Sequence, residues 1–207
     1  MSDPHQALAL ETCSLSLAAE LKRATDTVHL RLHQHPLLVQ LHQTTLTRSG
    51  YCQVLNAFYE FYSLWEPRYS SSTPAFSYQA MPLKWLAQDF AVLDRPCPLP
   101  AWRQDTDRSP GGLSEMIGYL YVKQGSTLGG QHISRHVQRQ LGLTPGESQF
   151  FFHGFGDRTG LYWKVFQRFL NEVDLSGELD IDAAKASALS AFESLEAILN
   201  GKIKGKQ

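Results

Sequence analysis

The sequence predicts an all-α, single-domain protein of about seven or eight helices, and three observations support this prediction. Apolar residues recur every three to four positions along most of the 207-residue chain, which is the period of an amphipathic helix. No segment shows the sustained alternation of β-branched and polar residues that a half-buried strand would have. A hydrophobic content of 43% suffices for one sizeable core, and no linker-like segment divides the chain.

The first two helices are predicted from apolar spacing and from prolines. Ser14 or Ser16 can cap the first helix, and apolar residues then repeat at helical spacing until Pro36 breaks the pattern. A second helix is expected to begin near Ser49 and to end before Pro67. Its apolar positions are mostly aromatic: Val54, Phe58, Phe61, Tyr62 and Trp65.

The later helices are separated by segments rich in proline, glycine and serine. Loops are expected at residues 70–74 and 95–112, with a helix from Pro82 to about Asp94 between them and a long helix over 113–141. Capping signals predict the remaining elements: a helix start at the capping box Thr144–Glu147, a helix from Thr159 to Asn171 capped by Asp157, and a final helix from Asp180 or Asp182 to about Asn200, stopped by Gly201.

The termini and the composition exclude several classes of protein. Flexible tails are expected at residues 1–13 and 201–207, which leaves a folded domain at 14–200. The N-terminus lacks a basic start, and no apolar run approaches the ~20 residues of a membrane span. Three widely spaced cysteines without a Cys-x-x-Cys pair argue against a disulfide framework or a structural zinc site. A cytoplasmic location is expected, and a net charge of −1 suggests neither nucleic acid nor membrane as a partner.

The most informative segment is the glycine-bearing part of the long helix. Each interior glycine costs a helix roughly 0.8–1 kcal/mol relative to alanine, and this helix carries Gly118, Gly125, Gly129 and Gly130. Gly125 and Gly129 are four residues apart and share one face. A bare face lets either another helix or a flat ligand come very close, and the sequence alone leaves both open. The spacing matches neither a P-loop nor a dinucleotide-binding fingerprint.

His29 is a candidate metal ligand on the first helix. A histidine on an apolar-periodic helix can present one ring nitrogen to a metal while the other bonds a neighbouring acceptor. An ordinary half-buried histidine is the alternative, and His33, four residues on, could form a chelating pair with it. Lys22, two turns earlier on the same face, could pair with a carboxylate of a bound ligand or simply be solvated. Lys164 and Arg168 could act in the same way.

Two blocks of the sequence resemble the biliverdin-forming heme oxygenases, in particular their soluble bacterial branch. The first, Leu21–His29, is similar to the family's N-terminal segment that ends in the proximal histidine. The second, Tyr121-Val-x-x-Gly-Ser-Thr-Leu-Gly-Gly130, is similar to the family's distal-helix signature. Aromatic-rich segments at 58–65 and 163–170 occur in a fitting order, so the resemblance spans about residues 15–200.

The resemblance implies a heme-oxygenase-like helical bundle with heme held between the first helix and a glycine-rich, kinked distal helix. It implies that His29 is the proximal iron ligand. The heme-binding residues that it implies are Lys22, His29, Gly125, Gly129, Lys164 and Arg168. The catalytic residues that it implies are Gly125, Ser126 and Gly129.

The activity implied by the resemblance is oxidative cleavage of heme to biliverdin, with release of carbon monoxide and iron. Heme would be both substrate and cofactor, O2 the oxidant, and an external donor such as a ferredoxin or a flavin reductase the source of electrons. A bilin-accepting phytochrome is a further expected partner. Neither the cleaved meso carbon nor the physiological purpose, iron acquisition or bilin supply, follows from these residues.

One departure from the family pattern concerns proton supply. Animal-type members have an aspartate directly after the first distal glycine, which organises water near bound oxygen, and this chain has Ser126 there. Tyr121, His132 and Arg135 are candidates to replace it. Two other functions stay open: a heme carrier or sensor that does not degrade heme, and a helical relative that degrades thiamin with a cysteine nucleophile, for which Cys52 is the candidate.

Overall fold

Nine helical segments make up the computed structural model, which describes residues 16–69, 79–98 and 112–204. The seven α-helices are α1 (Leu17–His33), α2 (Pro36–Val39), α3 (Arg48–Tyr69), α4 (Pro82–Val92), α5 (Leu113–Leu141), α6 (Thr159–Leu175) and α7 (Ile181–Lys204). Two 3₁₀ helices, η1 (Gln40–His42) and η2 (Gly156–Arg158), complete the set. Within these ranges the only β-pairing is one isolated bridge, between Pro145 and Gln149. The predicted all-α fold is confirmed.

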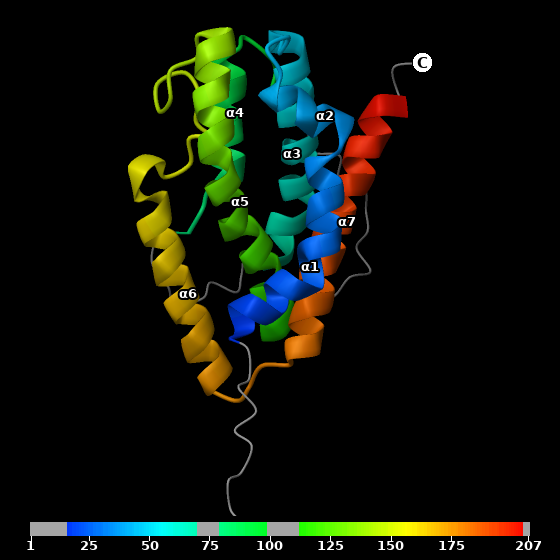
Figure 1. Cartoon of the computed structure of the whole chain (residues 1–207), viewed down its shortest axis with the longest axis vertical. Helices are drawn as coiled ribbons and strands as arrows, with labels where there is room; N and C mark the ends of the chain where they lie inside the picture. The colour runs from blue at the N-terminus through cyan, green and yellow to red at the C-terminus, as the bar shows by residue number, and fades with distance from the viewer. Residues whose placement is uncertain (1–15, 70–78, 99–111, 205–207) are drawn as a thin grey trace, which may run out of the picture.

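The two longest helices, α5 and α7, form the centre of the bundle. Helix α7 also packs on α1 and α3, whereas α6 packs on α5 and α1 from the other side (Figure 1). A β-carbon added to Gly118 of α5 would overlap the carbonyl oxygen of Ala184 and lie 2.9 Å from the backbone nitrogen of Ala188, both in α7. The backbones of α5 and α7 therefore touch at Gly118, as only a glycine allows.

Aromatic side chains of α3 fill much of the core, and they explain why this helix continues past Pro67. The helix was expected to end before Pro67, and this prediction was wrong, because α3 runs on to Tyr69. A proline removes one hydrogen bond from the helix, but the ring of Tyr69 stacks on that of Tyr119 at 5.4 Å and the guanidinium of Arg68 lies 4.7 Å from the ring centre of Trp65. These contacts hold the last turn in place.

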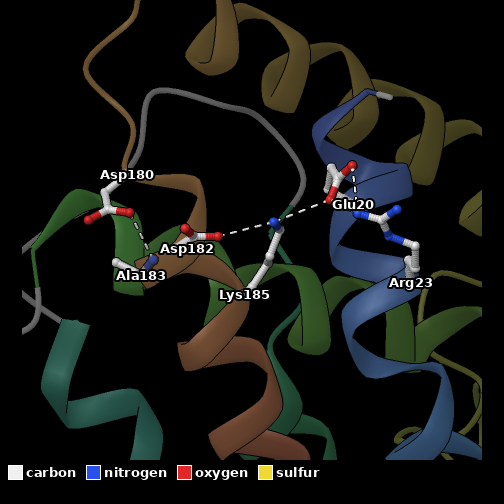
Figure 2. Close-up of polar contacts among 6 residues, drawn as sticks. All are labelled: Glu20, Arg23, Asp180, Asp182, Ala183 and Lys185. Carbon is white, nitrogen blue, oxygen red and sulfur yellow. Dashed lines mark hydrogen bonds and ion pairs between the residues drawn. The ribbon is translucent and has the colours of Figure 1, made fainter. Parts of the chain in front are cut away.

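Charged side chains join the start of α1 to the start of α7. Figure 2 shows Lys185 between Glu20 and Asp182, with N–O distances of 3.2 and 3.1 Å, and Arg23 beside Glu20 at 2.9 Å. Solvent screens all of these charges, so each pair contributes little to the free energy of unfolding. Their effect is to fix the relative position of the two helix ends.

The predicted start of the last helix is confirmed, but its predicted end is wrong. The carboxylate of Asp180 accepts a hydrogen bond from the backbone N–H of Ala183 at 3.0 Å, which is the N-cap interaction that the sequence indicated (Figure 2). Helix α7 then continues through Gly201 to Lys204. Beyond the predicted stop, Lys202 pairs with Glu60 of α3 at 2.6 Å, and this contact supports the additional turn.

The capping box at Thr144–Glu147 does not begin a helix. The carbonyl oxygen of Thr144 instead accepts N–H groups from residues 147, 148 and 149, and Gly146 has a φ of 79°, outside the helical region. The following amides, of Phe150 and Phe151, donate to the carboxylate of Asp89 and not to a helical carbonyl. Hydrogen bonds to the distant carboxylate of Asp89 are therefore formed in place of the helix that the capping box predicted.

The other boundaries differ by a few residues from the predictions. Helix α6 begins at Thr159 as expected, but it continues to Leu175, and Asp157 lies in η2 without capping it. Helix α4 ends at Val92, shortly before Asp94, whose φ is 50°. The tail at 1–13, the loop at 70–74 and most of the connection at 95–112 lie outside the described residues. None of the described helices has an apolar stretch long enough to cross a bilayer.

Asp89 is the buried carboxylate that holds the segment between α5 and α6. It is 1% exposed and accepts N–H groups from Phe150 at 2.6 Å and Phe151 at 3.0 Å. Burial raises the pKa of the Asp89 carboxyl to about 7, although the two N–H bonds act to lower it. The protonation of this group therefore affects how firmly α4 holds the segment.

We expect Gly118→Ala to destabilise the fold by about 1–3 kcal/mol, because the added methyl group forces the backbones of α5 and α7 apart. Gly129→Ala is the matched control, since a β-carbon at Gly129 meets nothing within 4 Å. That control should be neutral or stabilising by up to about 1 kcal/mol through helix propensity. Urea unfolding followed by circular dichroism measures both changes, and equal effects would contradict the proposed close contact.

We expect the stability that Asp89 contributes to decrease as pH rises. The native pKa of about 7 lies above the ordinary value of 3.8, so the folded state binds more protons between these values. This contribution is complete below the ordinary pKa and is lost as pH rises through about 7. The free energy of unfolding of the wild type should therefore fall relative to that of Asp89→Asn between about pH 5 and pH 8. Urea unfolding at both pH values measures this difference, and the same difference between wild type and Asp89→Asn at both pH values would contradict the prediction.

Candidate functional site

The four glycines of α5 are of two kinds. Gly118 meets α7, and a β-carbon on Gly130 would lie 2.7 Å from the carbonyl oxygen of Phe152, so both serve close backbone packing. A β-carbon on Gly125 would meet only ring carbons of Trp163, at 3.9 Å, and one on Gly129 would meet nothing within 4 Å. Packing among the described residues therefore explains only the first pair. Gly125 and Gly129 leave one face of α5 bare, and we call these two residues the glycine face.

His29 lies on α1 with its ring held between two neighbours. The ring centres of His33 and Phe192 lie 4.5 and 5.6 Å from that of His29, both in edge-to-face arrangements. The outer edge of the side chain is exposed, yet partial burial and the neighbouring His33 lower the pKa of His29. A lowered pKa favours the neutral imidazole, which is the form that binds a metal.

Helix α1 is tied to α5 beside the glycine face. Burial raises the pKa of the Tyr121 phenol, one turn before Gly125, and the nearby Thr25 side chain of α1 acts to lower it. The Thr25 hydroxyl itself donates to the carbonyl of Leu21 at 2.8 Å. Thr25 and His29 are four residues apart and lie on the same side of α1. The histidine helix and the glycine helix therefore lie side by side at Thr25 and Tyr121.

The three predicted cations lie at the surface on two helices. Lys22 pairs with Asp26 one turn along α1, at 2.9 Å, and both side chains are well exposed. Lys164 and Arg168 are exposed on α6 and form no salt bridge with any residue in the described ranges. The two α6 cations are thus available for an anionic ligand, whereas Lys22 would first have to leave Asp26.

Ser126 turns its hydroxyl towards α3. Its Oγ donates to the carbonyl oxygen of Lys123 at 2.8 Å and lies 3.0 Å from the phenol oxygen of Tyr62. The next residue, Thr127, donates to the carbonyl of Gln124 at 2.7 Å in the same manner. Such side-chain bonds to carbonyls of the preceding turn bend helices, and here two of them lie between Gly125 and Gly129.

A buried ion pair lies next to Ser126 at the contact between α3 and α5. The ammonium of Lys123, whose side chain is 7% exposed, pairs with Glu66 at 2.8 Å. The phenol of Tyr119 donates to the same carboxylate at 2.7 Å. Neither this group nor Tyr62 is among the predicted site residues. The spacing of these residues indicates only part of the arrangement. Tyr62 and Glu66 lie one turn apart on one face of α3, and Tyr119 and Lys123 lie one turn apart on one face of α5.

Other predicted candidates have different surroundings. Arg135 is exposed and its Nε donates to the carbonyl of Gln131 at 3.4 Å, while His132 is exposed one turn beyond Gly129. Burial raises the pKa of the Cys52 thiol, in spite of two nearby arginines, so this thiol is not activated as a nucleophile. In the described ranges no group of three or more histidine, cysteine or acidic side chains could hold a metal ion.

The residues of the glycine face and of α1 fit a flat metal macrocycle better than a bare metal ion. A single neutral histidine supplies one ligand, which is too few for an isolated metal site but is the usual axial ligand of heme. Gly125 and Gly129 offer a bare helix face that alanine would narrow at no packing gain. A flat ligand would use the two glycines that helix packing leaves unexplained.

A sequence model of a protein family described as heme oxygenase matches residues 15–200 of this chain. Comparison with curated protein sequences finds no match. Three solved structures share the fold, with 15–19% sequence identity, which supports an argument about fold alone.

The three structures are all bacterial heme oxygenases. The NO- and CO-bound enzyme from Neisseria meningitidis is 19% identical, with a TM-score of 0.66 over 91% of this chain and 92% of that one. The enzyme from Leptospira interrogans is 17% identical, with a TM-score of 0.70 over 89% and 98%. Heme oxygenase-1 from Synechocystis, in complex with heme, is 15% identical, with a TM-score of 0.64 over 92% and 96%.

We expect the two halves of the buried ion pair to respond unequally to substitution. Glu66→Ala would leave the ammonium of Lys123 buried and unpaired, at a cost of about 3–5 kcal/mol. Lys123→Met should cost clearly less, because the Glu66 side chain is 27% exposed and can turn towards water. Urea unfolding of both variants tests this order, which would be reversed if Glu66 were the more deeply buried partner.

Proposed function

The chain belongs to the heme oxygenase family, an oxidoreductase family, and on this premise we propose that it cleaves heme oxidatively to biliverdin. The observation that carries the proposal is the glycine face. Two glycines lower the helix propensity of α5, although no packing contact requires a glycine at either position. A heme-binding helix needs such a face, because heme is flat and must lie close to the backbone for the ring edge to be reached.

The chemistry comes from the substrate itself. Heme, when bound, supplies an iron that activates dioxygen against its own porphyrin ring, so that carbon monoxide, iron and biliverdin are released. Electrons would come from an external donor such as a ferredoxin or a flavin reductase. We propose two alternative physiological purposes for the reaction: iron acquisition, or bilin supply to a phytochrome.

His29 is the proposed axial ligand of the iron. Partial burial and the neighbouring His33 lower its pKa, which favours the neutral imidazole, and its ring packs against His33 and Phe192. A thiolate ligand donates electron density to iron and thereby favours O–O cleavage, and a neutral histidine donates less. His29 therefore binds the substrate without directing the chemistry away from the ring.

The remaining residues position the substrate. Gly125 and Gly129 allow the backbone of α5 to approach one side of the ring, and Ser126 lies beside them. Lys164 and Arg168 on α6 are the proposed partners of the two propionates, because both are exposed and form no salt bridge within the described ranges. Lys22 on α1 is a third, and it would exchange Asp26 for a propionate.

The alternative function is a heme carrier or sensor, and Ser126 is the observation that favours it. A carboxylate on the distal helix can organise water strongly, whereas a serine hydroxyl offers a weaker, uncharged acceptor. The degradation hypothesis thus requires that Ser126, or a group near it, still hold water. The carrier hypothesis has no such requirement.

The experiment that separates these functions uses the purified full chain. Hemin is added, then ascorbate in air, and the absorption spectrum is followed. Loss of the Soret band with growth of a red-region bilin band is expected for an oxygenase, and the isomer of the pigment identifies the cleaved carbon. A persistent Soret band would support the carrier. Failure to bind hemin would contradict both functions.

We expect His29→Ala to lose the absorption spectrum of the wild-type hemin complex and to abolish turnover, because it removes the proposed iron ligand. His33→Ala is the matched control, one turn along the same helix, and it should retain the spectrum and turn over within a few-fold of the wild type. Hemin titration and the ascorbate assay measure both. The opposite pattern would assign the iron to His33.

A further inference from the structure

The glycine face of α5 is bounded by aromatic rings at one end and is open at the other. Tyr121, Gly125 and Gly129 follow one another at intervals of four residues, so they form one row along the helix. A β-carbon on Gly125 would lie 3.9 Å from Cζ3 and Cη2 of Trp163, whereas one on Gly129 would meet nothing within 4 Å. The rings of Tyr121 and Trp163, with centres 6.0 Å apart, bound the Gly125 end, and we call them the aromatic wall.

Trp163 is held on two sides by other rings. Its ring centre lies 6.0 Å from that of Tyr121 and 5.6 Å from that of Phe166. An indole has only two side-chain torsions, and contacts on two sides restrict both. The side chain is half-buried, and the carbons nearest to Gly125 belong to the outer edge of its six-membered ring. This edge is apolar, so it suits contact with the rim of a flat, apolar ligand.

Helix α6, which carries Trp163, is fixed to α5 just past the glycine face. The side-chain amide of Gln131 donates to the hydroxyl of Thr159 at 2.9 Å and also to the carbonyl oxygen of Gly156. Thr159 is the first residue of α6 and is only 2% exposed. Trp163 follows Thr159 by about one helical turn. The bonds of Gln131 therefore help to fix how far the indole reaches towards Gly125.

The same helix carries the cations proposed as partners of the propionates. Lys164 and Arg168 are four residues apart and share one face of α6, and Lys164 directly follows Trp163, about 100° around the helix axis. Ion pairs tolerate some displacement, because the Coulomb energy changes slowly with distance. Repulsion between atoms in contact rises steeply. Trp163 is therefore the more exact of the two constraints that α6 places on a ligand at the glycine face.

We propose that Trp163 is a specificity-determining residue, which sets the in-plane rotation of heme on the glycine face and so determines which meso carbon is presented for cleavage. With the propionates at Lys164 and Arg168, rotation of the ring in its own plane would press a peripheral substituent against the indole. The open end at Gly129 sets no such limit. This inference rests on the proposed function, because it requires heme at the glycine face.

The first test measures the seating of the ring and does not depend on turnover. Hemin is bound to the purified full chain, cyanide is added to the ferric complex, and proton NMR records the shifted resonances of the heme methyl groups. Their pattern depends on the rotation of the ring relative to the axial histidine. Trp163→Ala should change this pattern or add a second set of resonances, and Trp163→Phe should give a smaller change.

Trp85→Phe is the matched control for Trp163→Phe. Trp85 lies on α4 and packs against Phe155 at 5.2 Å, away from the two glycines of the glycine face, so its substitution should leave the methyl pattern unchanged. An unchanged pattern in Trp163→Ala, or an equal change in Trp85→Phe, would overturn the role of Trp163. If Trp163→Ala does not fold, Trp163→Phe decides, since it also withdraws the ring edge from Gly125.

The second test is the isomer composition of the product. After turnover of the hemin complex with ascorbate in air, Trp163→Ala should raise the share of a minor biliverdin isomer several-fold over the wild type, as measured by chromatography. Hemin affinity should stay within a few-fold, because the cations are kept. A lower unfolding temperature of the heme-free variant with an unchanged isomer ratio would show that Trp163 serves packing only.

The two tests separate this inference from the proposed function. A wild type that binds hemin but forms no bilin would refute the proposed function, and the methyl pattern would still decide whether Trp163 sets the seating of the ring. A wild type that binds no hemin would refute both.

Discussion

The contact of α5 with α7 at Gly118 is the constraint on which the rest of the structure depends. Helices normally lie 8–10 Å apart, and a glycine lets the two backbones come closer than any side chain would. Two hydrogen bonds near this point strengthen the contact: the Ser187 hydroxyl donates to the carbonyl of Glu115 at 2.7 Å, and the N–H of Asp180 donates to Ser114 at 2.9 Å. Together they fix the rotation of α5 about its own axis, and so the direction of each side chain along it.

Helix α7 also positions α1, the helix that carries His29. Arg31 of α1 makes two hydrogen bonds of 2.8 Å to Glu196, and the ring of Phe192 packs against that of His29. Helix α1 also contacts α5 directly, where Thr25 lies near Tyr121. The proposed site residues therefore lie on helices and not on loops, and side chains on helices are held more precisely than side chains on loops.

Several polar groups are buried at a cost in stability. Asp89 is buried with its pKa raised, and a buried ion pair such as Lys123–Glu66 often contributes less than apolar residues of similar size. Asp89 has a structural role, because it fixes the segment that packs on Gly130. The ion pair lies within one turn of Ser126, and with Tyr62 it makes the contact between α3 and α5 polar just behind the glycine face.

The sequence by itself determined the helices and the candidate residues, because both depend on local properties. Apolar periodicity placed α1, α5 and α6, and the cost of glycine in a helix drew attention to Gly125 and Gly129. Predictions from local sequence were wrong where contacts with distant residues decided the conformation. The segment after Thr144 bonds Asp89 and does not form the expected helix. Stacking of Tyr69 on Tyr119 supports the last turn of α3, beyond Pro67. Only the tertiary structure separated the packed glycines from the open ones and set the direction of the Ser126 hydroxyl. Its partner Tyr62 lies 64 residues away in the chain, and no local pattern specifies a contact between residues that only folding brings together.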